Sequence, residues 1–244
     1  MRYGLMQMGH GYYEKGEERA VKVNDLFDRI ASRYDLINDV QSGGFHRLWK
    51  GRLVRMAALK PGQKALDVCC GTGDVTMAMA ESGANVCGLD FNARMLEVAR
   101  RRVARAAVKK VEFLQGDALQ IPFGESVFDV VAISYGLRNL SDFEGGISEL
   151  YRVTKPGGRI LVLDFGKPSN KIWRWIYYTY LRCMVPVFGR MFCGDAAAYA
   201  YILESLQAYP AQEGVAGALR KLGCVKERII PLLGGAMSIN YAEK

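Results

Sequence analysis

A glycine turn near position 70 carries the residues best suited to chemistry. The segment 66–74 reads Leu-Asp-Val-Cys-Cys-Gly-Thr-Gly-Asp, an apolar run that leads into Gly71 and Gly73. Glycines at such a turn let the backbone come close to a ligand. Asp67 and Asp74 bracket the turn with negative charge, which disfavours a pyrophosphate and favours a ligand with cationic or hydrogen-donating groups. The residue types therefore favour S-adenosylmethionine, which has sulfonium and ammonium groups, over a dinucleotide.

Two further aspartates follow at the ends of later apolar runs. Asp90 lies 17 positions after Gly73, where an acidic side chain can accept hydrogen bonds from the hydroxyls of a ribose. Asp117 ends the next run, and its carboxylate suits an adenine amino group. A glycine turn, a ribose acid and an adenine acid at three successive strand ends would form one cofactor site. The alternative is that these aspartates, Asp74 above all, are helix N-caps.

Five short apolar runs predict the strands that position these residues. They are continuous rather than alternating, which is typical of strands buried on both faces in a parallel sheet. Segments with helical character separate them, and this alternation predicts a right-handed doubly wound α/β fold. The predicted strands are 65–70, 86–91, 111–114, 127–134 and 159–165, and the predicted helices between them are 75–81, 93–106 and 143–153.

Two other parts of the chain do not follow this alternation. Apolar residues at helical spacing predict helices from Val23 to Tyr34 and over 48–59, so that residues 21–60 form an N-terminal helical cap. An aromatic and basic stretch after the fifth strand predicts a helical insertion over 167–210, which includes a helix at 196–207.

The last segment predicts a helix at 212–222 and strands at 227–232 and 236–241. The Leu-Gly-Gly connection between the two strands implies a hairpin, and hence one antiparallel strand. The fold prediction is one domain over residues 21–244, an α/β fold with a Rossmann-like, doubly wound, seven-stranded and mostly parallel sheet. Residues 1–20 are polar and without periodicity, and we expect a mobile N-terminal arm there.

Three blocks of sequence resemble a known family. The first is Phe-Asp-Arg-Ile-Ala-Ser-Arg-Tyr-Asp-Leu-Ile-Asn-Asp at 27–39, with His-Arg-Leu-Trp-Lys at 46–50. The second is Ser-Tyr-Gly-Leu-Arg-Asn at 134–139, and the third is Tyr-Arg-Val-Thr-Lys-Pro-Gly-Gly-Arg at 151–159, which leads into Leu-Asp-Phe. Over roughly residues 22–242 the chain resembles the C-methyltransferases of menaquinone and ubiquinone biosynthesis, which are class I Rossmann-like S-adenosylmethionine-dependent enzymes.

The resemblance implies a set of cofactor-binding residues. Family members carry Asn or Asp at the position that contacts adenine, which fits Asp117. The chain departs from the family pattern at Cys69-Cys70, one of several variants of the approach to the turn, and at Asn240, where many members carry histidine. The resemblance assigns cofactor binding to Thr72, Asp90, the Asp117–Ala118 pair and Ser134, and the turn itself adds Asp67, Gly71 and Gly73.

The reaction implied by the resemblance is methyl transfer to a ring carbon of a demethylated isoprenoid quinol. A menaquinone head group is favoured over a ubiquinone one. A neutral aromatic carbon is a poor nucleophile, so the site must help to remove a proton from the neighbouring hydroxyl and must align the reactants tightly.

Arg138 and Asn139 are the first candidates for this chemistry. They lie just beyond the fourth predicted strand, at the carboxyl edge of the sheet where substrates bind. The guanidinium of Arg138 stays protonated, so it suits stabilising a phenolate or orienting a water molecule rather than acting as a free base. The alternative for Arg138 is a salt bridge to Asp142 or Glu144.

The N-terminal cap supplies further candidates. Tyr34 and Asp35 can close over the ring, and the alternative for Tyr34 is a contact between cap and core. His46 is a second candidate for the base, but beside Arg47 and Lys50 we favour a structural role for it.

Composition argues against several classes of protein. The six cysteines form no C-x-x-C pair and the chain has two histidines, so we expect no metal site and reduced thiols in a cytoplasmic protein. The first residues hold no apolar signal segment. The most membrane-like stretch, 172–192, contains three arginines and a proline, so we do not expect it to cross a bilayer.

The net charge of +8 bears on partners. It is concentrated in residues 46–64, 94–110 and 166–194. A nucleic-acid methyltransferase is disfavoured, because the segment 134–139 has neither an Asn/Asp-Pro-Pro-Tyr motif nor a cysteine. We interpret the first and third stretches as a lipid-facing rim and hypothesise peripheral attachment to the inner face of the cytoplasmic membrane. The alternative for the third stretch is a buried cap helix that only closes the active site. A soluble small-molecule substrate is a further alternative for the function, and the sequence also leaves a homodimer open.

Overall fold

One seven-stranded sheet organises the molecule. The computed structural model describes residues 24–25, 27–193, 205–206 and 209–244. The strand order is β3-β2-β1-β4-β5-β7-β6, in which β7 is antiparallel to both neighbours and the other pairs are parallel. This confirms the predicted mostly parallel sheet. The strands are β1 (Lys64–Val68), β2 (Asn85–Asp90), β3 (Val111–Gln115), β4 (Phe128–Ser134), β5 (Thr154–Phe165), β6 (Val225–Leu232) and β7 (Met237–Glu243).

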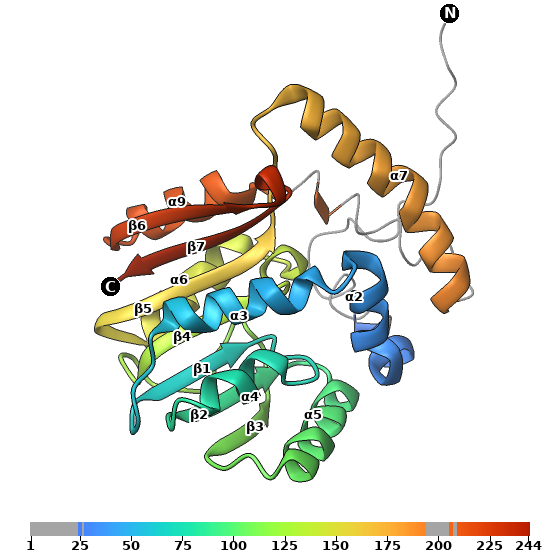
Figure 1. Cartoon of the computed structure of the whole chain (residues 1–244). Helices are drawn as coiled ribbons and strands as arrows, with labels where there is room; N and C mark the ends of the chain where they lie inside the picture. Colours follow the sequence, from blue (N-terminus) through green and yellow to red (C-terminus); the bar gives the residue numbers. More distant parts are fainter. Residues whose placement is uncertain (1–23, 26, 194–204, 207–208) are drawn as a thin grey trace, which may run out of the picture.

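Helices cover both faces of this sheet, as in a doubly wound fold (Figure 1). α3 and α4 pack on one face, while α6 and α9 pack on the other. The α-helices are α2 (Tyr34–Ser42), α3 (Phe45–Ala57), α4 (Asp74–Ala80), α5 (Ala93–Ala106), α6 (Phe143–Val153), α7 (Lys171–Cys193) and α9 (Ala211–Lys221), and short 3-10 turns are η1 (Ala31–Arg33), η2 (Leu137–Asn139) and η3 (Leu233–Gly235).

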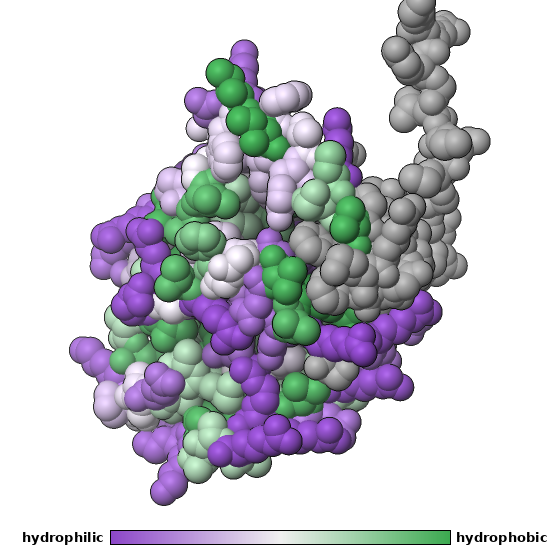
Figure 2. Space-filling model, turned by 45° about the vertical axis from the view of Figure 1, so that its right-hand side comes forward, coloured by the Kyte–Doolittle hydropathy of each residue, from purple (hydrophilic) through white to green (hydrophobic). Residues whose placement is uncertain are grey.

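α7 extends away from the sheet and reaches toward α2 (Figure 1). A separate buried cluster joins this helix to the N-terminal segment, and it includes Ile30, Ile37, Tyr177 and Leu181. Figure 2 shows hydrophobic side chains exposed at the upper end of the molecule, where Figure 1 places the first turns of α7. Residues of the cap and α7 line a cavity at the carboxyl edge of the sheet.

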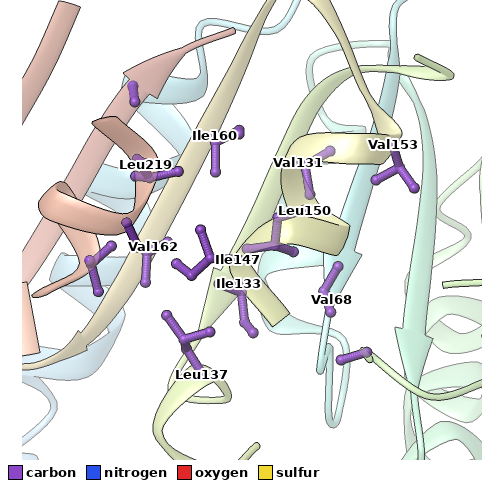
Figure 3. Close-up of a cluster of buried hydrophobic side chains, with 14 of the residues drawn as sticks. Val68, Val131, Ile133, Leu137, Ile147, Leu150, Val153, Ile160, Val162 and Leu219 are labelled. Carbon is purple, nitrogen blue, oxygen red and sulfur yellow. The ribbon is translucent and has the colours of Figure 1, made fainter. Parts of the chain in front are cut away.

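The core explains why the strands read as continuous apolar runs. In β4, Val131 and Ile133 point to the cluster under α6 and α9, whereas Val130 and Ala132 point to the cluster under α3 and α4. Figure 3 shows the first cluster, in which Leu150 of α6 and side chains of the central strands meet. Because both faces are covered, the four successive positions from Val130 to Ile133 are all buried.

Several element boundaries differ from the predictions. β1 ends at Val68 rather than Cys70, because Cys69 adopts a left-handed backbone with φ +54°. The described residues 24–25 and 27–30 are helical, as predicted. The helix does not continue to Tyr34, because the 3-10 turn η1 follows and a new helix begins at Tyr34. The predicted arm 1–20 lies outside the described residues, as does the helix predicted at 196–207 apart from residues 205–206.

Candidate active site

The loops after β1 and β4 meet where the direction of the strand order reverses. Both leave their strands through a left-handed residue, Cys69 at φ +54° and Tyr135 at φ +61°. A Cβ on Gly136 would lie 2.4 Å from the Cβ of Cys69, so only glycine lets the two loops come this close. Such a reversal is where an open α/β sheet forms a crevice for its ligand.

The two glycines of the turn have different functions. Gly71 has φ +54° and donates its backbone N–H to Oδ2 of Asp90 at 2.8 Å. Gly73 has φ +82°, and a Cβ there would lie 3.1 Å from the ring of Phe113 and 3.2 Å from the Cβ of Ala99. Gly71 therefore fixes the turn to β2, whereas Gly73 allows close packing against α5 and β3.

A cavity of about 140 Å³ lies beside this turn. Three predicted cofactor residues do not line it: Asp67, Thr72 and Gly73. Two of the predicted catalytic residues do, Tyr34 and Asn139. The predicted cofactor residues that line the cavity are Gly71, Asp90, Asp117, Ala118 and Ser134.

The lining of this smaller cavity is acidic. Asp90 accepts backbone N–H bonds from Gly71 and Asn92, and burial raises the pKa of its carboxyl above the usual range. Asp117 is exposed and accepts the N–H of Leu119. Among the described lining residues there is no Lys, Arg or His. The charge of the cavity therefore suits a cationic ligand and not a pyrophosphate.

Three residues that line the smaller cavity have a buried polar atom with no hydrogen-bond partner among the described residues. These atoms are Oγ of Ser134, the hydroxyl of Tyr135 and Oδ1 of Asn139. A buried polar atom without a partner is costly, and a bound ligand with hydrogen-bonding groups removes that cost. Together with the carboxylates of Asp90 and Asp117, these atoms fit the ribose, adenine and amino-acid groups of S-adenosylmethionine.

Asp67 lies behind the turn rather than beside the ligand space. It is 1% exposed and accepts a hydrogen bond from Thr76 Oγ1 at 2.6 Å. Burial, the largest cause, raises the pKa of this carboxyl to about 7. The charge that was expected from Asp67 therefore comes from Asp90 and Asp117 instead.

Asp74 is also not a free charge beside the ligand space. Its carboxylate bonds to Lys50 Nζ at 2.8 Å and to Arg102 Nη2 at 2.5 Å. It stands at the first position of α4, and Gly73 occupies the N-cap. Asp74 was expected to supply negative charge to a cationic ligand or, as the alternative, to be a helix N-cap. In the structure it does neither, because two cations bind its carboxylate and Gly73 is the N-cap.

The cap is tied to the glycine turn by the same network. Thr72 Oγ1 donates to Asp35 Oδ1 at 2.7 Å, and Arg102 Nη1 contacts both Asp35 Oδ2 at 3.0 Å and the Thr72 carbonyl at 2.9 Å. Asp35 was expected to close over a ring and instead bonds to the turn. Sequence reasoning missed Arg102, although its signal was visible in the unassigned basic stretch 94–110.

A larger cavity of about 510 Å³ lies between the cap, α7 and the carboxyl edge of the sheet. Its lining is mainly apolar and aromatic, with contributions from α2, α3, α7 and η3. It shares Phe27, Tyr34 and Tyr135 with the smaller cavity, so the two spaces adjoin at these rings. The remaining aromatic lining includes Trp49, Phe165, Trp173, Tyr177 and Tyr180.

Arg138 lines the larger cavity and pairs with an unexpected partner. Its Nη1 lies 2.9 Å from Oδ1 of Asp164 and 2.7 Å from the carbonyl of Tyr135, and its guanidinium lies 4.6 Å from the centroid of Phe165. The proposed alternatives are wrong, because Asp142 caps α6 through the N–H of Gly145. Glu144, the other alternative, lies 3.5 Å from Lys221.

Two tyrosines separate the cavities. Burial raises the pKa of both Tyr34 and Tyr135 above that of an ordinary phenol, so both stay protonated at neutral pH. The hydroxyl of Tyr135 is buried without a partner among the described residues. Sequence reasoning named Tyr34 but gave Tyr135 no function, although it stands inside the block at 134–139.

No group of three or more His, Cys, Asp or Glu side chains among the described residues is placed to hold a metal ion. No helix in the described part is both long enough and apolar enough to span a membrane.

Methyltransferases are among the known proteins that this chain resembles. The profile of the ubiE/COQ5 methyltransferase family matches residues 14–244. The chain is 35% identical over 231 residues to the demethylmenaquinone methyltransferase of Bacillus cereus (strain ATCC 10987 / NRS 248). The aligned region covers 93% of this chain and 98% of that protein. Over 232 residues it is 35% identical to the demethylmenaquinone methyltransferase of Bacillus anthracis (strain CDC 684 / NRRL 3495), with the same coverage of 93% and 98%.

Solved structures share the fold. A SAM-dependent methyltransferase from Thermotoga maritima superposes with a TM-score of 0.63 at 18% identity, over 90% of this chain and 99% of that one. A SAM-dependent methyltransferase from Aquifex aeolicus superposes with a TM-score of 0.57 at 19% identity, over 79% of this chain and 88% of that one.

Proposed function

The chain belongs to the ubiE/COQ5 methyltransferase family and is an S-adenosylmethionine-dependent methyltransferase, and from this premise we propose that it methylates a ring carbon of demethylmenaquinol to give menaquinol. The head group is proposed from the curated relatives at 35% identity, which are named demethylmenaquinone methyltransferases. The same transfer to a ubiquinone precursor is the alternative that the experiment below separates.

The observation that carries the proposal is the pair of adjoining cavities. The smaller one is acidic and has unpartnered buried oxygens at Ser134 and Asn139. The larger one is about 510 Å³ and lined mainly by apolar and aromatic side chains. A polar cationic cofactor and a flat ring with an isoprenoid tail need such a pair of spaces, joined at one point.

We assign the cofactor-binding residues within the smaller cavity. Asp90 accepts hydrogen bonds from the ribose hydroxyls, and Asp117 with Ala118 contacts the adenine. Gly71 and Ser134 line the space between them. When bound there, S-adenosylmethionine supplies a methyl group on a positively charged sulfur.

Three residues support the cofactor site from behind. Thr72 and Gly73 hold the turn against the cap and α5, and Asp67 anchors α4 through Thr76. Their contribution is the shape of the turn rather than a contact with the cofactor.

Arg138 is assigned to the ring. Its guanidinium lines the larger cavity and is held in place by Asp164 and the Tyr135 carbonyl. A fixed cation at this position stabilises negative charge on the ring oxygen as the hydroxyl loses its proton. Asn139 lies on the other side of the same turn, at the cofactor. Tyr34 and Tyr135 exclude water where the two cavities join.

The test is a transfer assay with labelled S-adenosylmethionine and three separate acceptors. They are demethylmenaquinol, the matching ubiquinol precursor and a tRNA pool. We expect label in the demethylmenaquinol alone. Oxidised demethylmenaquinone serves as the control, because it has no ring hydroxyl to lose a proton and is expected to stay unlabelled. Label in the ubiquinol precursor or in tRNA, with none in demethylmenaquinol, would contradict the proposal.

The route of the substrate leads us to a second proposal, attachment to the inner face of the cytoplasmic membrane. On α7, Ile172, Trp175, Ile176 and Tyr180 are exposed at helical spacing, the first two at 73% and 70%. Ile176 and Tyr180 also line the larger cavity. Figure 2 shows exposed hydrophobic side chains at this end of the molecule. An apolar helix face at the opening of a cavity fits a long tail that enters from lipid.

Basic side chains flank this apolar face, which we call the α7 stripe (Ile172, Trp175, Ile176 and Tyr180). Lys171 and Arg182 are exposed on the same helix. Positive charge beside exposed apolar residues is typical of surfaces that bind anionic lipid.

A further inference from the structure

His46 has a position at the substrate cavity that the proposed function does not use. Its side chain is 3% exposed, and it lines the larger cavity from the first turn of α3. Nε2 lies 2.8 Å from Oδ1 of Asp39 on α2. Nδ1 is buried and has no partner among the described residues. One ring nitrogen is thus held by a carboxylate while the other is left without a bond.

The partners of Asp39 decide which nitrogen carries the hydrogen. Arg47 binds both oxygens of Asp39, with its Nε and Nη2 each at 2.7 Å. This fork and the bond from His46 hold the pKa of Asp39 well below its usual range. An ionised carboxylate can only accept hydrogen bonds, so Nε2 of His46 is the protonated nitrogen. In the neutral ring Nδ1 then carries a free electron pair.

The surroundings keep the ring neutral. Burial, the largest cause, lowers the pKa of His46 below its usual value, and Lys50 on the same helix acts in the same direction. Asp39 from α2 and Asp74 from α4 oppose this shift without reversing it. The other titratable or charged side chains on the cavity wall are Tyr34 from α2, Tyr135 from the loop after β4, Arg138 from η2, and Tyr177 and Tyr180 from α7.

The other groups near the ring are poor proton acceptors. Arg138 is a cation paired with Asp164. Burial raises the pKa of Tyr34, Tyr135 and Tyr177, so their phenols keep their protons at neutral pH. A neutral imidazole is the side chain best suited to take a proton near pH 7.

We propose that His46, oriented by Asp39, is the catalytic base that accepts the proton of the ring hydroxyl. This inference rests on the proposed function and replaces the structural role that the sequence favoured for this histidine. It also gives Asp39 a function as a positioning residue, since the carboxylate fixes the tautomer and stabilises the imidazolium that forms.

The step balances without any further reactant. Nδ1 of His46 takes the hydroxyl proton, the O–H electron pair moves into the ring, and the adjacent ring carbon bonds to the methyl carbon. The bond between that methyl carbon and sulfur breaks, and its electrons stay on the sulfur. The hydrogen on the methylated ring carbon then leaves as a proton while the ring oxygen is protonated again. One proton is released per turnover.

The test compares His46→Gln and Asp39→Asn with wild type in the demethylmenaquinol assay. We expect His46→Gln to lower kcat by about 10²–10⁴-fold, with the KM of the quinol and the Kd of S-adenosylmethionine nearly unchanged. Asp39→Asn is expected to lower kcat less, because the imidazole remains. Arg52→Gln is the matched control, since it removes an exposed side chain from the same helix and does not line the cavity.

The pH profile separates a base from a structural residue. A base works only when unprotonated, so wild-type kcat is expected to fall as the pH drops through the pKa of His46, which burial lowers below its usual value. In His46→Gln this fall should vanish from the residual activity, and added imidazole should restore part of the rate. A variant that loses stability and cofactor affinity together, and keeps the acid fall, would assign His46 a structural role and overturn the proposal.

The tautomer of His46 can be measured by NMR without any turnover, so this test does not depend on activity. The chain has two histidines, so the imidazole ¹⁵N signals of wild type can be assigned by comparison with His46→Gln. We expect the Nε2–H tautomer for His46 and a signal that moves when quinol is added. The Nδ1–H tautomer, or an imidazolium at pH 7, would overturn the inference. Wild type that is inactive on demethylmenaquinol would instead contradict the proposed function.

Discussion

At the residue scale, the pair formed by Arg138 and Asp164 combines stability with chemistry. The side chains are 7% and 2% exposed, and Asp164 also accepts the backbone N–H groups of Arg138 and Phe165. A buried ion pair of this kind contributes little net stability as a pair, but removal of one partner leaves a buried charge alone. Its value here is the fixed position of a cation at the ring.

A double variant distinguishes these two contributions. Arg138→Gln alone is expected to lower the free energy of unfolding by about 3–5 kcal/mol, because Asp164 loses its cation. Arg138→Gln with Asp164→Asn should recover most of this loss, since both charges are gone and the amides can still bond. Both variants should have kcat reduced by about 10²-fold or more, with the Kd of S-adenosylmethionine nearly unchanged. Chemical denaturation and the transfer assay are the measurements. Full activity in the double variant would remove Arg138 from the mechanism.

Asp90 is the residue whose change should affect the cofactor most directly. Asp90→Asn is expected to raise the Kd of S-adenosylmethionine about 10–100-fold, because charge-assisted bonds to the ribose hydroxyls are lost. Isothermal titration calorimetry gives this value. Glu97→Gln, at an exposed position on the following helix, is the control and should leave the Kd within about twofold. An unchanged Kd in Asp90→Asn would show that Asp90 only supports the turn through Gly71 and Asn92.

At the element scale, the notable arrangement is the bond between the cap and the cofactor turn. Asp35 at the start of α2, Arg102 on α5 and Thr72 in the turn contact one another at 2.7–3.0 Å. The three belong to segments that are far apart in the sequence. Any change that loosens the turn is therefore expected to loosen the cap that covers the substrate cavity.

Arg102→Gln tests this coupling. Without the guanidinium, the carboxylates of Asp35 and Asp74 lose their shared cation, so amide hydrogen exchange in α2 is expected to become faster. The Kd of S-adenosylmethionine should rise several-fold as the turn loses its bond to the cap. Arg101→Gln is the matched control, because the adjacent Arg101 pairs with Glu97 on the surface of the same helix. Equal exchange rates in α2 for both variants would argue that the cap is held by its apolar contacts alone.

At the scale of the whole molecule, charge is used in two different ways. On α5, Arg102 acts internally, through its bonds to the turn and the cap. Lys171 and Arg182 are instead exposed on α7, on the surface that we propose binds the membrane. Basic residues of this chain are thus found both in an internal network and on the exposed surface.

Flotation with lipid vesicles tests that surface. We expect wild type to float with phosphatidylglycerol vesicles and much less with phosphatidylcholine vesicles. Ile172→Ser with Trp175→Ser is expected to weaken binding at least about 10-fold, because two apolar side chains no longer enter the lipid. Val225→Ser, at an apolar position on β6 that is 55% exposed, is the control and should bind as wild type. If wild type fails to bind anionic vesicles, the attachment proposal is wrong.

The sequence by itself determined the sheet and the location of the cofactor turn. Continuous apolar runs are diagnostic of strands covered on both faces, and the structure confirms this in β4 and β5. The short Leu-Gly-Gly link likewise determined that β7 is antiparallel. These features could be predicted because they depend on the spacing of apolar residues and glycines along the chain, which is visible in the sequence.

Only the tertiary structure decided which charged group meets which. Arg138 binds Asp164 rather than its sequence neighbours Asp142 and Glu144, and His46 is oriented by Asp39 across the α2–α3 turn. Asp67 and Asp74 have the same charge in the sequence, yet one is buried behind the turn and the other is held by two cations. The physical reason is that the energy of an ion pair depends on the distance between its charges and on their burial. The packing of segments that are remote in sequence determines both, so the local spacing of residues cannot predict the pairs.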